Sequence, residues 1–86
     1  MKLYIATLIN HNEYGINAKT FVDTNVVNLA VSVCKVLDEE DLPFDPDDIL
    51  IECKNGNQHG AGEPLSVGVD TDYCREFLLT TKVTEI

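Results

Sequence analysis

The chain has 86 residues, 44% of them hydrophobic, which suits one small globular domain but leaves little room for a buried active-site cleft beside the core. Fifteen acidic residues against six basic ones give a formal net charge of −9. A surface this acidic repels phosphate backbones and anionic lipids, so we expect neither direct nucleic-acid binding nor membrane binding.

The three cysteines are odd in number, and their spacing is not that of a secreted disulfide framework, so reduced thiols are expected at Cys34, Cys53 and Cys74. The opening MKLYIATLIN has no small-residue cleavage site of the kind that ends a signal peptide. No apolar run approaches the ~18 residues of a membrane span. These features predict a cytoplasmic protein.

The first elements predicted are two strands joined as a hairpin. KLYIATLI, from Lys2 to Ile9, is apolar on both alternating faces, as in an interior strand or one that is covered on both sides. The polar segment from Asn10 to Gly15 favours a turn, with Gly15 free to adopt a positive φ. INAKTFVD then supplies β-branched and aromatic residues for a second strand.

A helix is predicted next, from about Asn25 to Glu39. Its apolar positions recur at steps of three and four residues along one face, and Asp23, Thr24 or Asn25 can cap it. The valines of this segment also alternate as they would in a strand. Some fourteen residues without Gly or Pro nevertheless fit a helix better than a strand.

Beyond the helix the sequence predicts an acidic connection over 38–48, a short strand ILIEC over Ile49–Cys53 and a Gly-rich loop over 54–64. Pro43 and Pro46 oppose a regular continuation of the helix. LSVGV and REFLLTTKVTEI, between Leu65 and Ile86, have β-type patterns. The predicted fold is therefore a single α+β domain, with one main helix on a mainly antiparallel sheet of about four strands.

The acidic connection is the leading candidate for a binding site, because it holds seven carboxylates in eleven residues. Acids at a helix C-terminus oppose the helix dipole, so Asp38, Glu39 and Glu40 stand where stability alone would prefer lysine. Tyr14 and Phe44 are the aromatics expected to be exposed as partner anchors. The predicted partner-binding residues are Tyr14, Asp38, Glu39, Glu40, Asp41, Phe44, Asp45, Asp47 and Asp48.

Metal and catalytic sites are weaker alternatives. The acid run lacks the glycine and the glutamate that an EF-hand needs, although a less regular divalent site stays open. The cysteines form no C-x-x-C pair for zinc. Cys53 and His59 could act as nucleophile and base, but nothing in the sequence sets their geometry. We therefore expect no enzyme activity, no metal and no cofactor.

The stretch KLYIATLINHNEYGINAKTF, followed by a capped helix, an acidic turn and a terminal strand, resembles small accessory proteins of phages and other mobile elements that open K-x-Y-I-A-T. The likeness covers Lys2 to about Glu40 and extends to Glu76–Ile86. Such proteins include anti-CRISPR and anti-restriction inhibitors that occupy the basic groove of a nuclease. The resemblance implies a genomic setting, that of a phage or another mobile element, and such a protein would act in the cytoplasm of the host cell.

Together these features predict a non-enzymatic acidic protein that inhibits a host-defence nuclease, or another nucleic-acid-binding protein, by covering its basic surface. Carboxylates can meet the lysines and arginines that otherwise pair with phosphate. The alternative is a protein that binds a small molecule or nucleotide signal through the Gly-rich loop, with Lys54, Asn57 and His59 as polar contacts. A homodimer would suit this alternative, because small chains often form pockets between subunits.

Overall fold

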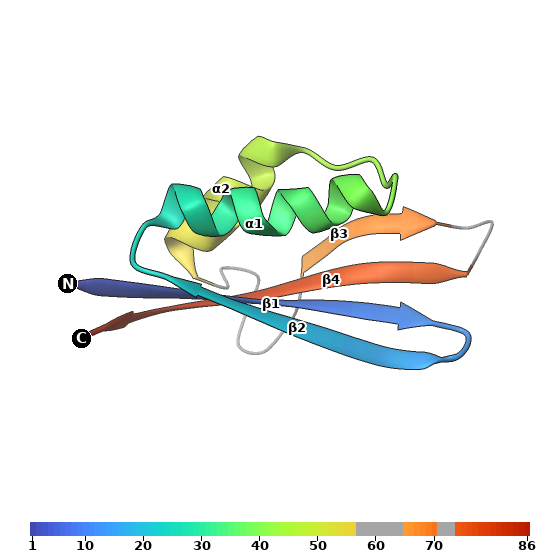
Figure 1. The fold of residues 1–86 in the computed structure, drawn as a ribbon, viewed down its shortest axis with the longest axis horizontal. Helices are drawn as coiled ribbons and strands as arrows, with labels where there is room; N and C mark the ends of the chain where they lie inside the picture. The colour runs from blue at the N-terminus through green and yellow to red at the C-terminus, as the bar shows by residue number, and fades with distance from the viewer. Residues whose placement is uncertain (57–64, 71–73) are drawn as a thin grey trace.

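The computed structural model describes residues 1–56, 65–70 and 74–86, and they form one α+β domain. A four-stranded antiparallel sheet with the order β2-β1-β4-β3 carries two helices on one face (Figure 1). The elements are β1 (Lys2–Asn12), β2 (Gly15–Asp23), α1 (Val26–Glu39), α2 (Pro46–Asn55), β3 (Leu65–Asp70) and β4 (Arg75–Glu85). The predicted fold class and the predicted antiparallel sheet are confirmed, but the described residues contain two helices where one main helix was expected.

The predicted hairpin is present, and its turn is closed by a side chain. Asn12 pairs with Gly15 at the end of the β1–β2 ladder. The Oδ1 atom of Asn12 accepts a hydrogen bond of 2.8 Å from the backbone N–H of Tyr14. Gly15 has a φ of 140°, which L side chains rarely adopt, so the expected positive φ at this glycine is confirmed.

The terminal strands complete the sheet. β4 pairs with β1 along most of its length, which makes β1 an interior strand, as one of the two sequence interpretations held. β3 lies at the edge and pairs with β4 through a register shift between Ser66 and Gly68. A Cβ atom at Gly68 would lie 3.2 Å from the Leu42 side chain, so the absence of a side chain lets the connection between the helices approach the sheet.

Helix α1 begins where the sequence predicted it. Asn25 is its N-cap, and its side chain accepts hydrogen bonds from the backbone N–H groups of Val27 and Asn28 at 3.0 and 3.1 Å. The buried residues follow the helical period and not the alternation of a strand. They are Leu29, Ala30, Val33 and Leu37.

The prediction of a short strand at Ile49–Cys53 is wrong, because these residues form the middle of α2. Asp45 caps this helix, Pro46 occupies its first turn and Gly56 ends it with a φ of 64°. Ile49, Glu52 and Cys53 are buried, which is a spacing of three and four residues. The aliphatic run looked like a strand because it was considered without the cap and stop signals on either side.

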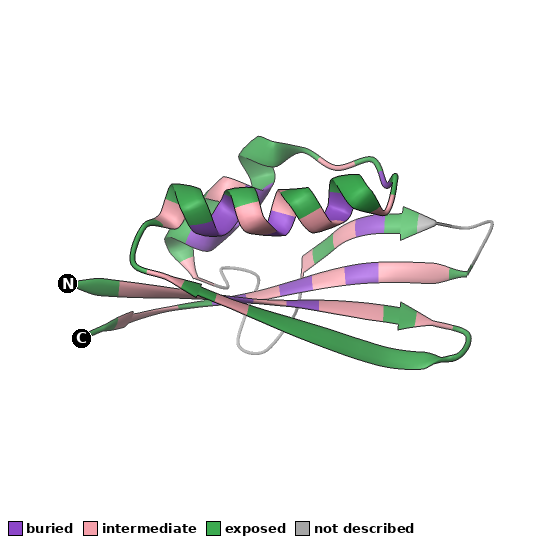
Figure 2. Ribbon diagram, in the orientation of Figure 1, coloured by how far each residue is buried: buried purple, intermediate pink, exposed green. Residues whose placement is uncertain are grey.

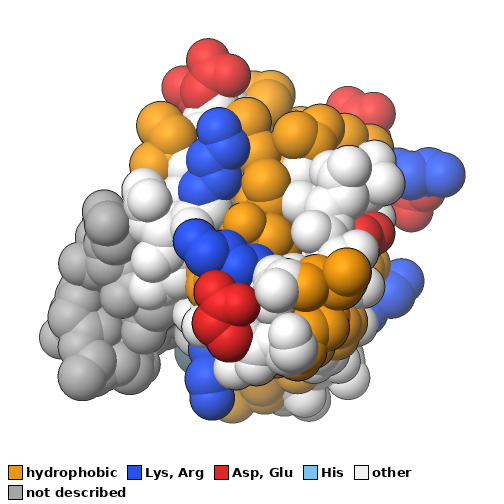
Figure 3. Space-filling model, turned by 90° about the vertical axis from the view of Figure 1, so that its left-hand side faces the viewer, with side chains coloured by type: hydrophobic (Ala, Val, Ile, Leu, Met, Phe, Trp, Pro, Cys, Tyr) orange, Lys and Arg blue, Asp and Glu red, His pale blue; other side chains and the backbone are white. Residues whose placement is uncertain are grey.

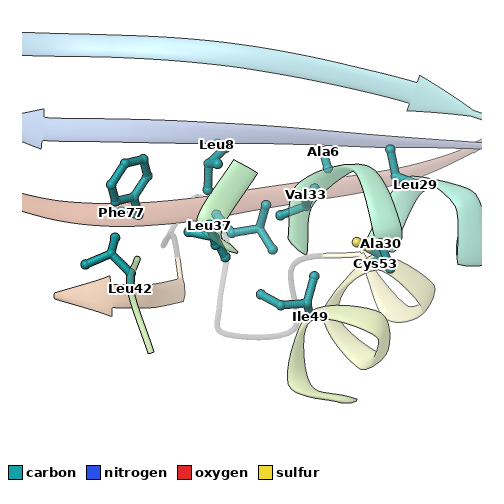
Figure 4. Close-up of a cluster of buried hydrophobic side chains, with 11 residues drawn as sticks. Ala6, Leu8, Leu29, Ala30, Val33, Leu37, Leu42, Ile49, Cys53 and Phe77 are labelled. Carbon is teal, nitrogen blue, oxygen red and sulfur yellow. The ribbon is translucent and has the colours of Figure 1, made fainter. Parts of the chain in front are cut away.

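The core lies between the helices and one face of the sheet (Figure 2). Figure 4 shows Ala6 and Leu8 of β1 and Phe77 of β4 in one cluster with buried side chains of both helices and with Leu42 of the connection between them. The Oγ1 atom of Thr81 also donates a 3.1 Å hydrogen bond to the carbonyl oxygen of Glu52, which joins β4 to α2. No helix in the described part of the chain is long and apolar enough to cross a membrane.

Candidate partner-binding surface

The acid run is not one continuous loop, because it is divided between the end of α1 and the start of α2. The first group is Asp38, Glu39, Glu40 and Asp41, and the second is Asp45, Asp47 and Asp48. Both groups belong to the helical layer, by which we mean α1, α2 and the connection between them. The C-terminal end of α1 points toward the end of the molecule opposite the two chain termini (Figure 1).

The second group stabilises the start of α2. The Oδ1 atom of Asp45 accepts a 3.0 Å hydrogen bond from the backbone N–H of Asp47, which is the bond of an N-cap. Asp47 and Asp48 lie in the first turn, where negative charge interacts favourably with the helix dipole. Three of the seven carboxylates therefore have a structural use that the sequence interpretation did not assign to them.

Glu40 is engaged by the only arginine of the sequence. The Nη1 atom of Arg75 lies 2.6 Å from Oε2 of Glu40, and Nη2 donates a 3.0 Å hydrogen bond to the carbonyl oxygen of the same residue. Glu40 is the C-cap of α1, so this pair joins the end of the helix to the start of β4. Its carboxylate is thus less available to a partner than the sequence suggested.

Asp38, Glu39 and Asp41 are exposed, and no side-chain hydrogen bond or ion pair holds them within residues 1–56, 65–70 and 74–86. Asp38 and Glu39 lie in the last turn of α1, which contains no basic residue. Carboxylates there oppose the dipole of the helix. Within the acid run, these three are the carboxylates to which the described residues give no structural use.

An apolar groove runs between α1 and α2 beside these acids, with a volume of about 410 Å³. Its lining residues are Val27, Ala30, Val31, Cys34, Lys35, Asp38, Phe44, Pro46, Asp47 and Leu50. Val27 and Val31 are 52% and 59% exposed, so the groove presents aliphatic surface to solvent. The groove is also lined by one carboxylate from each acidic group, namely Asp38 of α1 and Asp47 of α2.

The two aromatics predicted as exposed anchors are placed differently from each other. Phe44 is only partly exposed, because it packs against the core as well as lining the groove, so its description as an exposed anchor is corrected. Tyr14 is 93% exposed, as predicted, at the tip of the β1–β2 hairpin. It is not among the groove residues, and it shares a separate hollow with Arg75. The structure therefore brings Phe44, but not Tyr14, to the acidic groove.

The Gly-rich loop predicted at 54–64 begins later than expected. Lys54 lies in the last turn of α2, where its charge suits the helix dipole, and Gly56 follows as the C-cap. Asn57 and His59, the other two residues proposed for the ligand loop, lie outside the described residues. The ligand site at this loop stays a prediction.

The thiols of the two helices are packed rather than activated. Burial raises the pKa of Cys53 to about 11, with smaller contributions from Cys34 and Glu52, and burial also raises the pKa of Cys34. A raised pKa opposes the thiolate form that a nucleophile requires. Among the described residues, no three His, Cys, Asp or Glu side chains lie together so that they could hold a metal ion.

The end of the molecule that carries both termini differs from the acidic helical region. Charged side chains of both signs stand there among exposed hydrophobic ones (Figure 3). Lys54 of α2 and the ion pair between the terminal amino group and Glu85, at 3.5 Å, contribute to the mixture. This end therefore does not extend the acidic groove.

The sequence interpretation missed the aliphatic part of the groove. Val27 and Val31 lie four residues apart, off the stripe that includes Leu29 and Val33, and this spacing is the signal of a second apolar face on α1. The second wall could not be recognised while 49–53 was interpreted as a strand. Comparison with protein-family models, curated proteins and solved structures finds no match to this chain.

Proposed function

We propose that this protein is a non-enzymatic binding protein whose helical layer docks on the basic surface of a nucleic-acid-binding protein. The observation that carries the proposal is an apolar groove of about 410 Å³ whose rim includes Asp38 and Asp47. Proteins that bind nucleic acid present Lys and Arg side chains to phosphates, and carboxylates accept the same charge-assisted hydrogen bonds. The acids take the place of phosphates, and the groove contributes apolar contact.

The position of the unused acids supports this proposal. Asp38, Glu39 and Asp41 remain exposed at the C-terminal end of α1, where they cost the helix stability and gain no described partner. A net charge of −9 also attracts a basic partner from a distance and raises the association rate, an effect that weakens as salt screens it. Charge steers the encounter, and Val27 and Val31 lie where a partner can bury them.

The resemblance of the N-terminal half to phage accessory proteins suggests the kind of partner. A host-defence nuclease has a basic groove for its DNA or RNA, and a protein that covers this groove inhibits the nuclease without any catalytic residue of its own. Under this proposal, inhibition is competitive with the nucleic acid. The competition gives the proposal its most direct test.

The experiment uses two variants with the same change in net charge. Asp38→Asn with Glu39→Gln removes two of the unused acids, and Glu13→Gln with Glu85→Gln removes two acids that do not line the groove. Each protein is immobilised and exposed to host lysate at low and high salt, and retained proteins are then eluted with duplex DNA or RNA. We expect the unchanged protein and the Glu13/Glu85 variant to retain a nuclease that nucleic acid and salt both release. The Asp38/Glu39 variant should retain much less of it.

Two results would contradict the proposal. Equal retention by both charge variants would mean that the acids at the end of α1 do not form the contact. Retention that nucleic acid does not reverse would mean that the partner is held at a surface other than its phosphate-binding groove. Circular dichroism of both variants checks that the helices are intact.

A further inference from the structure

The face of the sheet that points away from the helices, which we call the open face because no described helix covers it, is apolar. Successive residues of a strand point to opposite faces, so the neighbours of buried Ala6, Leu8, Phe77 and Leu79 point away from the helices. β2 continues the same face through its register with β1. Aliphatic side chains from all four strands lie there, namely Leu3, Ile5, Ile9, Ile16, Val22, Val69 and Leu78.

This face is also nearly free of charge. Among its described residues, only Lys82 and Glu76 carry a formal charge at neutral pH, so the face sums to zero in a chain with a net charge of −9. The acid run lies on the other side, in the helical layer. Protein interfaces are depleted of charged residues at their centres. Two copies of this chain can therefore approach through this face while most of their acidic residues stay apart.

The two charges on this face complement each other under a twofold rotation. Lys82 and Glu76 lie on the same strand, six residues apart, which is roughly 20 Å of extended chain. Two sheets can face each other across a twofold axis that lies midway between them, at a right angle to β4 and level with Leu79. This axis puts Lys82 of each copy opposite Glu76 of the other. The contact is isologous, so the pair forms twice.

The same rotation matches the rest of the face. Lys82 shares its row of the sheet with Ile5 and Val22, and Glu76 shares its row with His11 and Ile16. The axis brings these two rows together, so aliphatic side chains meet beside each charge pair. The threonine row between them, in which Thr7 Oγ1 lies 3.2 Å from Thr20 Oγ1, meets the row that contains Ile9 and Leu78.

The face is large enough for a stable dimer. With strands ~4.8 Å apart and ~3.3 Å per residue, the four strands cover roughly 600 Å² of flat area. Side-chain relief raises the accessible area toward the ~800 Å² per partner that stable complexes bury. We propose that the open face of the sheet is a homodimer interface, in which two copies pack face to face as a β-sandwich with reciprocal Lys82–Glu76 pairs. The inference does not depend on the proposed function, because the groove between the helices stays on the outside.

The test is a charge exchange, measured by sedimentation equilibrium over a wide range of protein concentrations. The unchanged chain should reach twice the 9.5 kDa of one copy. Lys82→Glu and Glu76→Lys each place like charges opposite each other, and each should raise the dimer dissociation constant at least about tenfold. The double variant Lys82→Glu with Glu76→Lys restores opposite charges and should return the constant to within about threefold of the original.

Two further variants make the result specific. Lys54→Glu changes the net charge as Lys82→Glu does, but on α2, and it should leave the dimer intact. Thr20→Arg adds bulk and charge to this face at an exposed position of the edge strand β2, and it should give a monomer that still folds. Thermal unfolding of every variant separates loss of the dimer from loss of the fold.

Three results would overturn the inference. The first is a monomer at all concentrations of the unchanged chain. The second is a dimer whose dissociation constant is the same in all variants, which would place the interface elsewhere, such as on the edge of β2. The third is a failure of the double exchange to restore what the single exchanges weaken, which would exclude the twofold pairing.

Discussion

The most informative single perturbation is Asp45→Ala, because it separates the structural use of the acid run from its use as charge. Asp45 is exposed, yet its side chain accepts the 3.0 Å hydrogen bond that caps α2. Alanine leaves the backbone N–H of Asp47 without this partner. The sequence interpretation treated Asp45 only as part of a binding patch, in which case alanine at this position would not affect stability.

The expected loss of stability has two parts. Replacement of an N-cap Asp by Ala typically costs about 1 kcal/mol. Removal of the negative charge from the N-terminus of the helix adds about 0.3–1 kcal/mol at an exposed site. For a domain of this size, 1 kcal/mol lowers Tm by roughly 4–8 °C, so the effect is measurable by thermal or urea unfolding followed by circular dichroism.

Asp45→Asn is the matched control, because asparagine caps helices about as well as aspartate while the charge is removed. It should retain most of the stability that alanine loses. Equal destabilisation by Asn and Ala would mean that charge, not capping, is what matters at this position. An Asp45→Ala protein as stable as the original would refute the assignment of Asp45 as the cap of α2.

Three other measurements test the fold. Leu79→Ala should lower the free energy of unfolding by about 2–5 kcal/mol, since Leu79 is fully buried. Ile16→Ala, at a site that is 68% exposed, should cost far less. Similar losses for the two variants would contradict the placement of the core. Gly56→Ala should lower the free energy of unfolding by roughly 1–2 kcal/mol, because φ at this residue is 64° and the new Cβ atom would lie 3.2 Å from a backbone nitrogen of β4. An unchanged Tm would argue against Gly56 as the C-cap of α2. Iodoacetamide at pH 8 should label exposed Cys74 well before buried Cys53, because a pKa of about 11 keeps the Cys53 thiol protonated. Mass spectrometry of the labelled peptides gives the order of labelling, and faster labelling of Cys53 would contradict its burial.

The proposals assign different surfaces to different partners. The acidic groove lies in the helical layer, whereas the face of the sheet with Lys82 and Glu76, whose charges sum to zero, lies on the other side of the molecule. A dimer formed through the sheet therefore presents two acidic grooves outward. A basic partner with two equivalent sites would then be bound more tightly than either groove alone allows.

The candidate site was predictable in part. The density of carboxylates is a property of the sequence, and so is the opposition of Asp38 and Glu39 to the helix dipole. The signals for α2 were also present, since Asp45-Pro46 begins a helix and Lys54 and Gly56 end one. They were missed because Ile49, Leu50 and Ile51 resemble a strand when the flanking residues are set aside.

The sequence by itself determined the local structure, namely the hairpin at Gly15, the helix that Asn25 caps and the terminal strands. These depend on backbone preference and on hydrophobic period, which act between near neighbours. Only the tertiary structure decided that Arg75 neutralises Glu40, that Phe44 packs on the core and that Asp38 and Asp47 share one groove. Such pairings depend on where α2 and β4 lie relative to α1, and no local pattern encodes the distance between residues far apart in the chain.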